Sequence, residues 1–163
     1  LHRDHVSPQA LRVLRDNRVR LHLHRDHCRG LEEDRYFCDM SDQDLTCCYS
    51  TREFAVTQHT LARPLRLSHD SPETHGFVFT RRGAGGSQLK AGYVADLGCF
   101  PPGLARQLAD CDLLALEFNH DEDMERSSSR HPRTIERVLS DEGHLSNDQA
   151  ADALDQILRH SRE

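Results

Sequence analysis

The sequence predicts a layered α/β domain. Helix-like and strand-like segments alternate along most of the chain, two strand-like runs flank a glycine-rich turn, and the last helix-like segment has a complete start signature. Strands that alternate with helices are typical of a sheet covered by helices. With 163 residues the chain is long enough for one core, and we expect a single domain over residues 1–163.

The first predicted elements are a helix and a strand. The helix covers residues 6–17, with Ser7 as its cap and Pro8 in its first turn. Residues 18–24, RVRLHLH, alternate polar and apolar side chains and predict a strand. Residues 28–50 carry few clear signals, and we expect loop or short helix there.

The middle of the chain predicts strands. Residues 53–57 and 61–68 are candidates for two short strands. GFVFTR at 76–81 and LKAGYVAD at 89–96 flank GAGGSQ, a pattern typical of a β-hairpin.

A helix and then a strand follow the predicted hairpin. The helix covers residues 101–111, with Pro102 near its start. DLLALEF at 112–118 is apolar along most of its length, which predicts a buried strand. The charged and serine-rich residues 121–131 predict a loop.

Two helices follow this loop. The first covers residues 133–140 and is ended by Gly143. The second covers residues 147–160 and begins at a capping box formed by Ser146 and Gln149. Four apolar residues form the expected inward stripe of this last helix: Ala150, Leu154, Ile157 and Leu158.

Composition restricts the possible function classes and the expected cellular location. The formal net charge of −6 argues against a broad nucleic-acid-binding surface, which usually shows a basic face. No window reaches the roughly 18 apolar residues of a membrane span, and no signal peptide is visible. We therefore expect a cytoplasmic protein without a membrane partner. The six cysteines show no CxxC spacing, and we expect reduced thiols.

Histidine and aspartate gather in short motifs. LHRDH occurs at 1–5 and again at 23–27, VADLG lies at 94–98, and DEGHLSN lies at 141–147. Twelve histidines are present, and at neutral pH they are mostly uncharged and available as ligands. Several imidazoles, one terminal carboxylate and one bridging carboxylate are about what two divalent metals need.

In their order along the chain, these motifs resemble the ligand set of metallo-β-lactamase-fold hydrolases. The matching residues are His2, Asp4, His5, His69, Asp96 and His144. The resemblance implies that His2 and His69 bind a first metal, that Asp4, His5 and His144 bind a second, and that Asp96 bridges both. Zinc is expected for the two divalent ions, with manganese or iron as alternatives. The implied fold is an αββα sandwich, and we expect it to be truncated at its N-terminus, without its first strands.

A second copy of the loop motif leaves the choice of ligand loop open. His22, His24, Asp26 and His27 form a complete HxHxDH pattern after an apolar strand. We favour the first copy, because a helix and then a strand normally follow this loop and residues 6–23 supply both.

Two C-terminal sequence segments, LLALEFNHDEDM and GHLSNDQAADAL, are similar to segments found in a bacterial subgroup of this superfamily, the YycJ/WalJ-type exonucleases. This resemblance implies a phosphodiesterase or nuclease that uses a dinuclear metal-bound hydroxide on a phosphodiester substrate such as DNA or RNA. Asp4 would orient the hydroxide, and His120 is a candidate proton donor to the leaving group. Alternatives are a hydrolase of small esters, lactones or thioesters, or an inactive fragment that lacks one metal ligand.

Charged residues near these motifs are candidates for supporting roles. Asp70 and Glu117 are placed to accept hydrogen bonds from neighbouring ligand histidines. Four arginines could grip phosphates, although a run of charges is more often a solvated face: Arg126, Arg130, Arg133 and Arg137.

Overall fold

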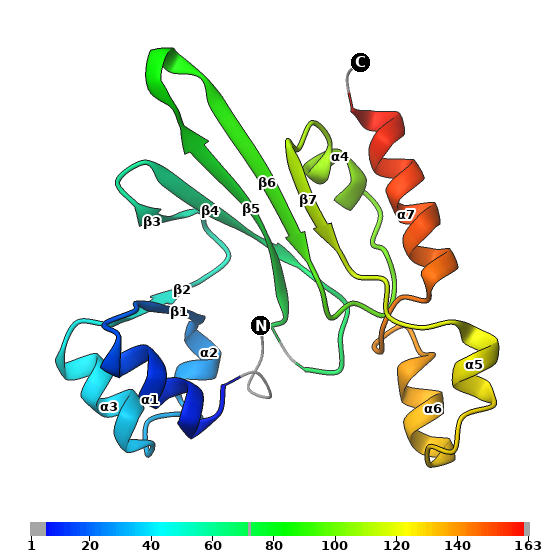
Figure 1. The fold of residues 1–163 in the computed structure, drawn as a ribbon, viewed down its shortest axis with the longest axis horizontal. Coiled ribbons are helices and arrows are strands. Elements are labelled where there is room, and N and C mark those ends of the chain that lie inside the picture. The colour runs from blue at the N-terminus through cyan, green and yellow to red at the C-terminus, as the bar shows by residue number, and fades with distance from the viewer. Residues whose placement is uncertain (1–5, 72, 162–163) are drawn as a thin grey trace. The chain divides into compact units, whose positions relative to one another are not determined.

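The computed structural model describes residues 6–71 and 73–161, and it divides the chain into two compact units with their boundary between Arg52 and Glu53 (Figure 1). Each unit has its own sheet and its own apolar core. The α/β class predicted from the sequence is confirmed. The single domain over residues 1–163 stays a prediction. In the described ranges, no helix combines the length and the apolar character needed to cross a membrane.

The first unit packs helices against a two-stranded parallel sheet. Strand β1 (Leu21–His24) pairs with β2 (Thr46–Tyr49), and the helices are α1 (Pro8–Asp16), α2 (Arg25–Cys28) and α3 (Arg35–Asp42). The sequence predicts α1 and β1, whereas α3 and β2 lie in the stretch with few clear signals. Buried apolar side chains from these elements and their turns form one core: Leu11, Leu23, Leu31, Phe37, Met40 and Leu45.

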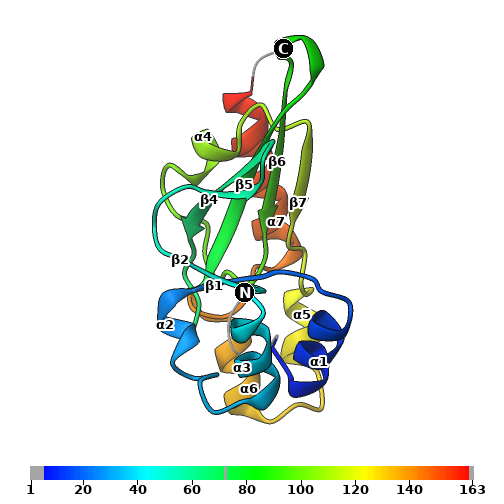
Figure 2. The ribbon, with the colours of Figure 1, turned by 90° about the vertical axis from the view of Figure 1, so that its left-hand side faces the viewer.

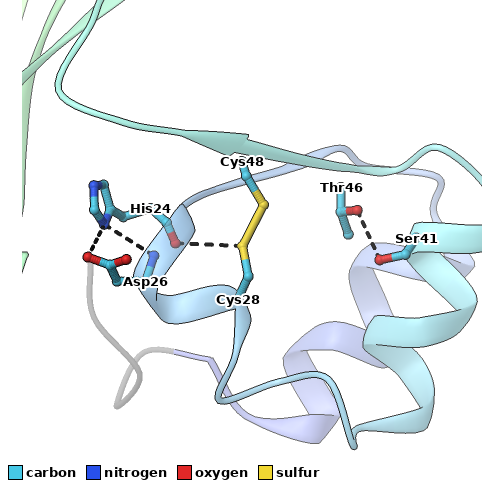
Figure 3. Close-up of a disulfide and its surroundings, with 6 residues drawn as sticks. All are labelled: His24, Asp26, Cys28, Ser41, Thr46 and Cys48. Carbon is cyan, nitrogen blue, oxygen red and sulfur yellow. Dashed lines mark hydrogen bonds and ion pairs between the residues drawn. A yellow bond between two sulfur atoms is a disulfide. The ribbon is translucent and has the colours of Figure 1, made fainter.

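A disulfide joins α2 to β2. Cys28 is the last residue of α2, and Cys48 lies on β2 with an exposed side chain (Figure 3). The expectation of six reduced thiols is therefore wrong for this pair, because the fold brings together two cysteines that are 20 positions apart. The other four cysteines are free: Cys38, Cys47, Cys99 and Cys111.

Reduction of this disulfide is expected to destabilise the first unit by about 3 kcal/mol, the usual value for a closed loop of this size. The measurement is urea unfolding followed by circular dichroism, for the untreated protein, the protein with reductant, and Cys48→Ser. Cys38→Ser is the control, because Cys38 is exposed and free. Equal midpoints for the oxidised and reduced proteins would contradict the expectation.

The second unit is built on a five-stranded sheet. Its strands lie in the order β3 (Phe54–Thr57), β4 (Thr60–Arg66), β5 (His75–Arg82), β6 (Gln88–Val94) and β7 (Leu113–Leu116). All neighbouring pairs are antiparallel except β6 and β7, which are parallel. The predicted hairpin is confirmed as β5 and β6, joined through a short 3₁₀ turn.

Helices cover one face of this sheet. Figures 1 and 2 show α4 (Leu104–Leu108) and α7 (Asn147–His160) along that face, and α5 (Glu122–Arg126) and α6 (Pro132–Val138) beyond the end of β7. Strands, α4, α7 and the turns between them share one core: Leu65, Leu67, Val78, Val94, Leu97, Leu104, Ala105, Leu108, Leu145, Ala150 and Ile157.

The start of α7 follows the sequence closely. The Ser146 hydroxyl accepts the Gln149 backbone N–H, and the Gln149 side chain accepts the Ser146 N–H, so the predicted capping box is confirmed. The predicted apolar stripe is partly wrong. Leu158 is 62% exposed, and Ala153 is fully buried instead.

Two further predictions in this unit are corrected. β7 is not a fully buried strand, because it is the edge strand of the sheet and its side chains alternate between the two faces; Leu113 is 68% exposed. Residues 121–131 are not all loop. Asp121 accepts the Met124 backbone N–H at 2.9 Å and so caps the short helix α5.

Candidate metal centre

The candidate site lies on three turns of the second unit. The first turn follows β4 and carries His69, the second follows β6 and carries Asp96, and the third lies between α6 and α7 and carries His144. β4 and β6 run in the same direction, one on each side of β5. The carboxyl ends of β4 and β6 therefore lie at the same end of the sheet, and ligands commonly bind at the carboxyl ends of strands.

Hydrogen bonds hold the three turns together. The Gly98 N–H donates to the Ser68 carbonyl at 2.9 Å, and the Ser68 hydroxyl donates to the Asp141 carbonyl at 2.9 Å. The Asp70 N–H donates to the Glu142 carbonyl at 2.9 Å. Because these bonds involve the backbone of all three turns, the side chains that the turns carry are held in place.

Two glycines permit close packing here, Gly98 against the turn that carries His144 and Gly143 against the end of α6. A Cβ atom at Gly98 would overlap the backbone of Asp141 and Gly143. A Cβ atom at Gly143 would overlap the backbone carbonyl groups of Arg137 and Val138. The glycines of the DLG and GH motifs are therefore needed for packing, which explains why each motif combines a glycine with a candidate ligand.

The side chains of His69, Asp96 and His144 converge. One possible ligand atom from each lies within 4.8 Å of the others. The two imidazole rings meet edge to face, with centroids 5.2 Å apart. The His69 side chain is 3% exposed and that of His144 is 20% exposed, so the cluster is half-buried but open to solvent on one side.

Hydrogen bonds engage the Nδ1 atom of each histidine. The Nδ1 atom of His69 lies 2.9 Å from the Gly143 carbonyl and must donate, because a carbonyl only accepts. The Nδ1 atom of His144 lies 2.7 Å from Oε1 of Glu117. Nε2 is therefore the ring nitrogen of each histidine that is left to accept, and metal-binding histidines commonly have the other ring N–H held by a carbonyl or carboxylate in this way. Nε2 of His69 also lies 3.2 Å from Oδ1 of Asp70. Two imidazoles and a carboxylate in this arrangement fit a divalent metal such as Zn²⁺.

Asp96 occupies a constrained backbone conformation. Its φ of 59° lies in the left-handed region, which few residues other than glycine, asparagine and aspartate adopt. Such residues gather at functional sites, where the surrounding structure maintains the strain. The Leu97 N–H, next in the chain, donates to Oε2 of Glu117 at 3.2 Å.

A second carboxylate stands next to His69. Oδ1 of Asp70 lies 3.2 Å from Nε2 of His69, and the other carboxylate oxygen pairs with Arg137. Arg137 is therefore connected to the cluster, whereas Arg126 and Arg130 pair with glutamates of α5.

A cavity of about 410 Å³ opens beside His69. Its charged lining consists of Arg66, Glu73 and Glu142, and Arg66 pairs with Glu73 at 3.6 Å. The cavity has room for a small substrate next to the cluster, and its wall carries two carboxylates and one guanidinium.

His120 lies beside the turn that carries His144. Its backbone forms a parallel bridge with Ser146, and its carbonyl accepts the Asn147 N–H at 2.8 Å. The Nδ1 atom of its ring is buried and has no hydrogen-bond partner within the part of the chain that the structure describes.

The remaining predicted ligands belong to the two loop copies. His2, Asp4 and His5 lie outside the described residues, so the assignment of ligands to a first and a second metal stays a prediction. The same holds for the roles given to Asp4 and for the choice between the two copies.

The second copy lies in the first unit. His22 and His24 are on β1, and Asp26 and His27 are in α2. His24 caps α2, since its Nδ1 accepts the Asp26 N–H at 3.4 Å (Figure 3). Burial, and then the nearby charge of Arg20, lower the pKa of His22.

Comparison with known proteins identifies relatives of this arrangement. A model of the beta-lactamase superfamily domain matches residues 1–161. The chain is also similar to the crystal structure of Zn²⁺-bound PqqB from Methylobacterium extorquens, with 16% sequence identity and a TM-score of 0.59. That similarity covers 91% of this chain and 50% of the PqqB chain, so this chain spans half the length of that protein. No curated protein matches the sequence.

Proposed function

This chain belongs to the beta-lactamase superfamily, and on that premise we propose that it is a metal-dependent hydrolase centred on His69, Asp96 and His144. The observation that carries the proposal is the convergence of these three side chains, with both Nδ1 atoms already held by acceptors. The site lies at the carboxyl ends of β4 and β6, and it is open to solvent beside the cavity that His69 lines.

We propose two divalent ions, with zinc first, and with His2, Asp4 and His5 completing the ligand set. The Zn²⁺ in the related PqqB structure supports this metal. When bound, such ions activate a water molecule and polarise the group under attack. The protein's own contribution is to hold the two imidazoles and the Asp96 carboxylate in place before the ions arrive.

A phosphodiester, as in DNA or RNA, is the substrate class that we propose first. Arg137 supports it, because this guanidinium is held near the cluster by Asp70 and is suited to bidentate contact with a phosphate. The similarity of the two C-terminal sequence segments to bacterial exonucleases also supports a phosphodiester substrate.

The second candidate is a small ester, lactone or thioester. Glu73 and Glu142 in the cavity wall favour it, since carboxylates repel a polyanion.

Two chromogenic substrates distinguish these candidates. We expect the purified protein to hydrolyse bis-p-nitrophenyl phosphate faster than p-nitrophenyl acetate. The activity should be lost with a chelator and restored by Zn²⁺ or Mn²⁺. Chelator-sensitive hydrolysis of the acetate alone would favour the second candidate. Hydrolysis that is insensitive to chelator in both cases would refute the proposed metal dependence.

His120 is proposed to deliver a proton to the leaving group, on the basis of its buried, unpartnered Nδ1 atom. His120→Asn should lower kcat about a hundredfold on a phosphodiester with an alkoxide leaving group, within the usual range for general acid catalysis. It should change little on bis-p-nitrophenyl phosphate, because p-nitrophenolate leaves without a proton. His160→Asn, at the exposed end of α7, is the matched control. An equal loss on both substrates would show that His120 serves another purpose.

A further inference from the structure

One carboxylate connects the Asp96 turn with the His144 turn. Glu117 follows β7, and its backbone N–H donates to the Val94 carbonyl at 2.9 Å, which fixes it beside the end of β6. From there Oε2 accepts the Leu97 N–H at 3.2 Å, directly after Asp96, while Oε1 lies 2.7 Å from Nδ1 of His144. A single side chain thus contacts two of the three ligand-bearing turns.

This carboxylate is also nearly saturated with donors. The Asn119 side-chain amide donates to Oε1 at 3.0 Å, in addition to the donors from Leu97 and His144. The Glu117 side chain is only 10% exposed, so water has little access to these bonds. In such surroundings a hydrogen bond to a charged acceptor is stronger than in water, and leaving a donor without its acceptor is costly.

We propose that Glu117 is the positioning residue of the metal centre: it keeps the proton of neutral His144 on Nδ1, so that Nε2 faces the cluster, and it fixes the distance between His144 and Asp96. This inference rests on the proposed function for its consequence, but the position of the proton is a property of the metal-free protein. Glu117 does not contact the substrate or the reacting atoms in this assignment.

The chemistry of the side chain explains why glutamate is required here. A glutamine at position 117 has one accepting oxygen and one donating NH₂ group. If its oxygen accepts from His144, its NH₂ group faces the Leu97 N–H, and two donors then oppose each other. Aspartate keeps the charge but is one methylene shorter, so it cannot reach both turns from the same backbone position.

The first test measures the His144 tautomer in metal-free protein. Nitrogen-15 NMR of histidine-labelled protein, at a pH where the ring is neutral, separates Nδ1–H from Nε2–H rings. Comparison with His144→Asn identifies the signal. We expect an Nδ1–H ring in the wild type and a mixture of tautomers in Glu117→Gln. An Nε2–H ring in the wild type would overturn the inference, whether or not the protein binds metal.

The second test measures Zn²⁺ affinity by competition with a chromophoric chelator. Glu117→Gln should weaken binding by 10- to 100-fold, the usual cost of losing a partner of a ligand histidine. Glu125→Gln is the matched control, because Glu125 is a buried glutamate of α5 that pairs with Arg130. It should leave the affinity within about twofold. Unchanged affinity in Glu117→Gln would refute the inference.

A third variant separates misfolding from loss of positioning. Glu117→Asp keeps the negative charge, and it should fold as the wild type does while still binding Zn²⁺ more weakly. Far-ultraviolet circular dichroism and the melting temperature of each metal-free variant establish the fold. If the wild type binds no Zn²⁺, the proposed function fails, and the tautomer measurement still decides the role of Glu117.

Discussion

Asp96→Asn is expected to remove metal from the centre and to lower hydrolysis by about a thousandfold or more. Asparagine has nearly the same shape and tolerates the φ of 59° at this position, so the change mainly removes a negative charge. That charge belongs to the only carboxylate in the cluster of His69, Asp96 and His144. Metal activation is worth several kcal/mol, and each 1.4 kcal/mol corresponds to a factor of ten in rate.

The measurement is the Zn²⁺ content after dialysis, together with kcat on the better chromogenic substrate. Asp110→Asn is a close control, because Asp110 has a φ of 56°, lies in the same unit and is exposed. It undergoes the same chemical change in the same backbone conformation. If Asp96→Asn retained the metal content and kcat of the wild type, the centre would have to be elsewhere.

Gly98→Ala is expected to destabilise the second unit by about 3 kcal/mol, at the upper end of the usual cost of overpacking. The added methyl group would overlap the backbone of Asp141 and Gly143, and backbone cannot rotate out of the way as a side chain can. The turn that carries His144 must therefore move away from the turn that carries Asp96. Metal affinity should fall together with stability.

The control for this variant is Gly83→Ala in the β5–β6 turn. There the nearest atom to the new methyl group is the Ser87 hydroxyl, which belongs to a short side chain that can rotate. Thermal unfolding compares the two variants. A loss of 3 kcal/mol corresponds to a decrease in Tm of roughly 6–12 °C in a chain of this size. Gly98→Ala with the Tm of Gly83→Ala would show that the turns are not packed as described.

Local signals account for the elements that the sequence predicts well. The capping box at Ser146 and Gln149 and the Ser7 cap of α1 involve residues three apart, so the sequence alone shows them. The β5–β6 hairpin depends on a turn of a few residues between two alternating runs. In each case, the interaction that decides the structure lies within the segment itself.

The elements that the sequence predicts poorly depend on distant parts of the chain. β2 is four residues long, and within the described ranges its strand partner is β1, more than 20 positions earlier. The exposure of Leu113 follows from the position of β7 at the edge of the sheet, and strand order is not visible in a run of apolar letters. The disulfide between Cys28 and Cys48 likewise depends on how α2 is placed against β2.

The candidate site shows the same division. Motif order along the sequence indicates His69, Asp96 and His144, because each motif is short and contains its own ligand. The reason for Gly98 could not be read from its motif, since this glycine makes room for a turn more than 40 positions later in the sequence, whereas Gly143 makes room for the nearby end of α6. Glu117 is recognisable as a possible acceptor, but its simultaneous contact with two turns depends on how the end of β7 lies beside the end of β6.

The β5–β6 turn offers a place to attach a probe. Gly85 and Gly86 have open space around them. β5 begins, and β6 ends, at the opposite end of the hairpin, where the candidate metal ligands lie. β5 is eight residues long, which separates the turn from that end by about 25 Å at the usual rise of a strand. A fluorophore or affinity tag inserted between these glycines would report on the protein at a distance from the reaction, and the measurements above could be made on immobilised or labelled material.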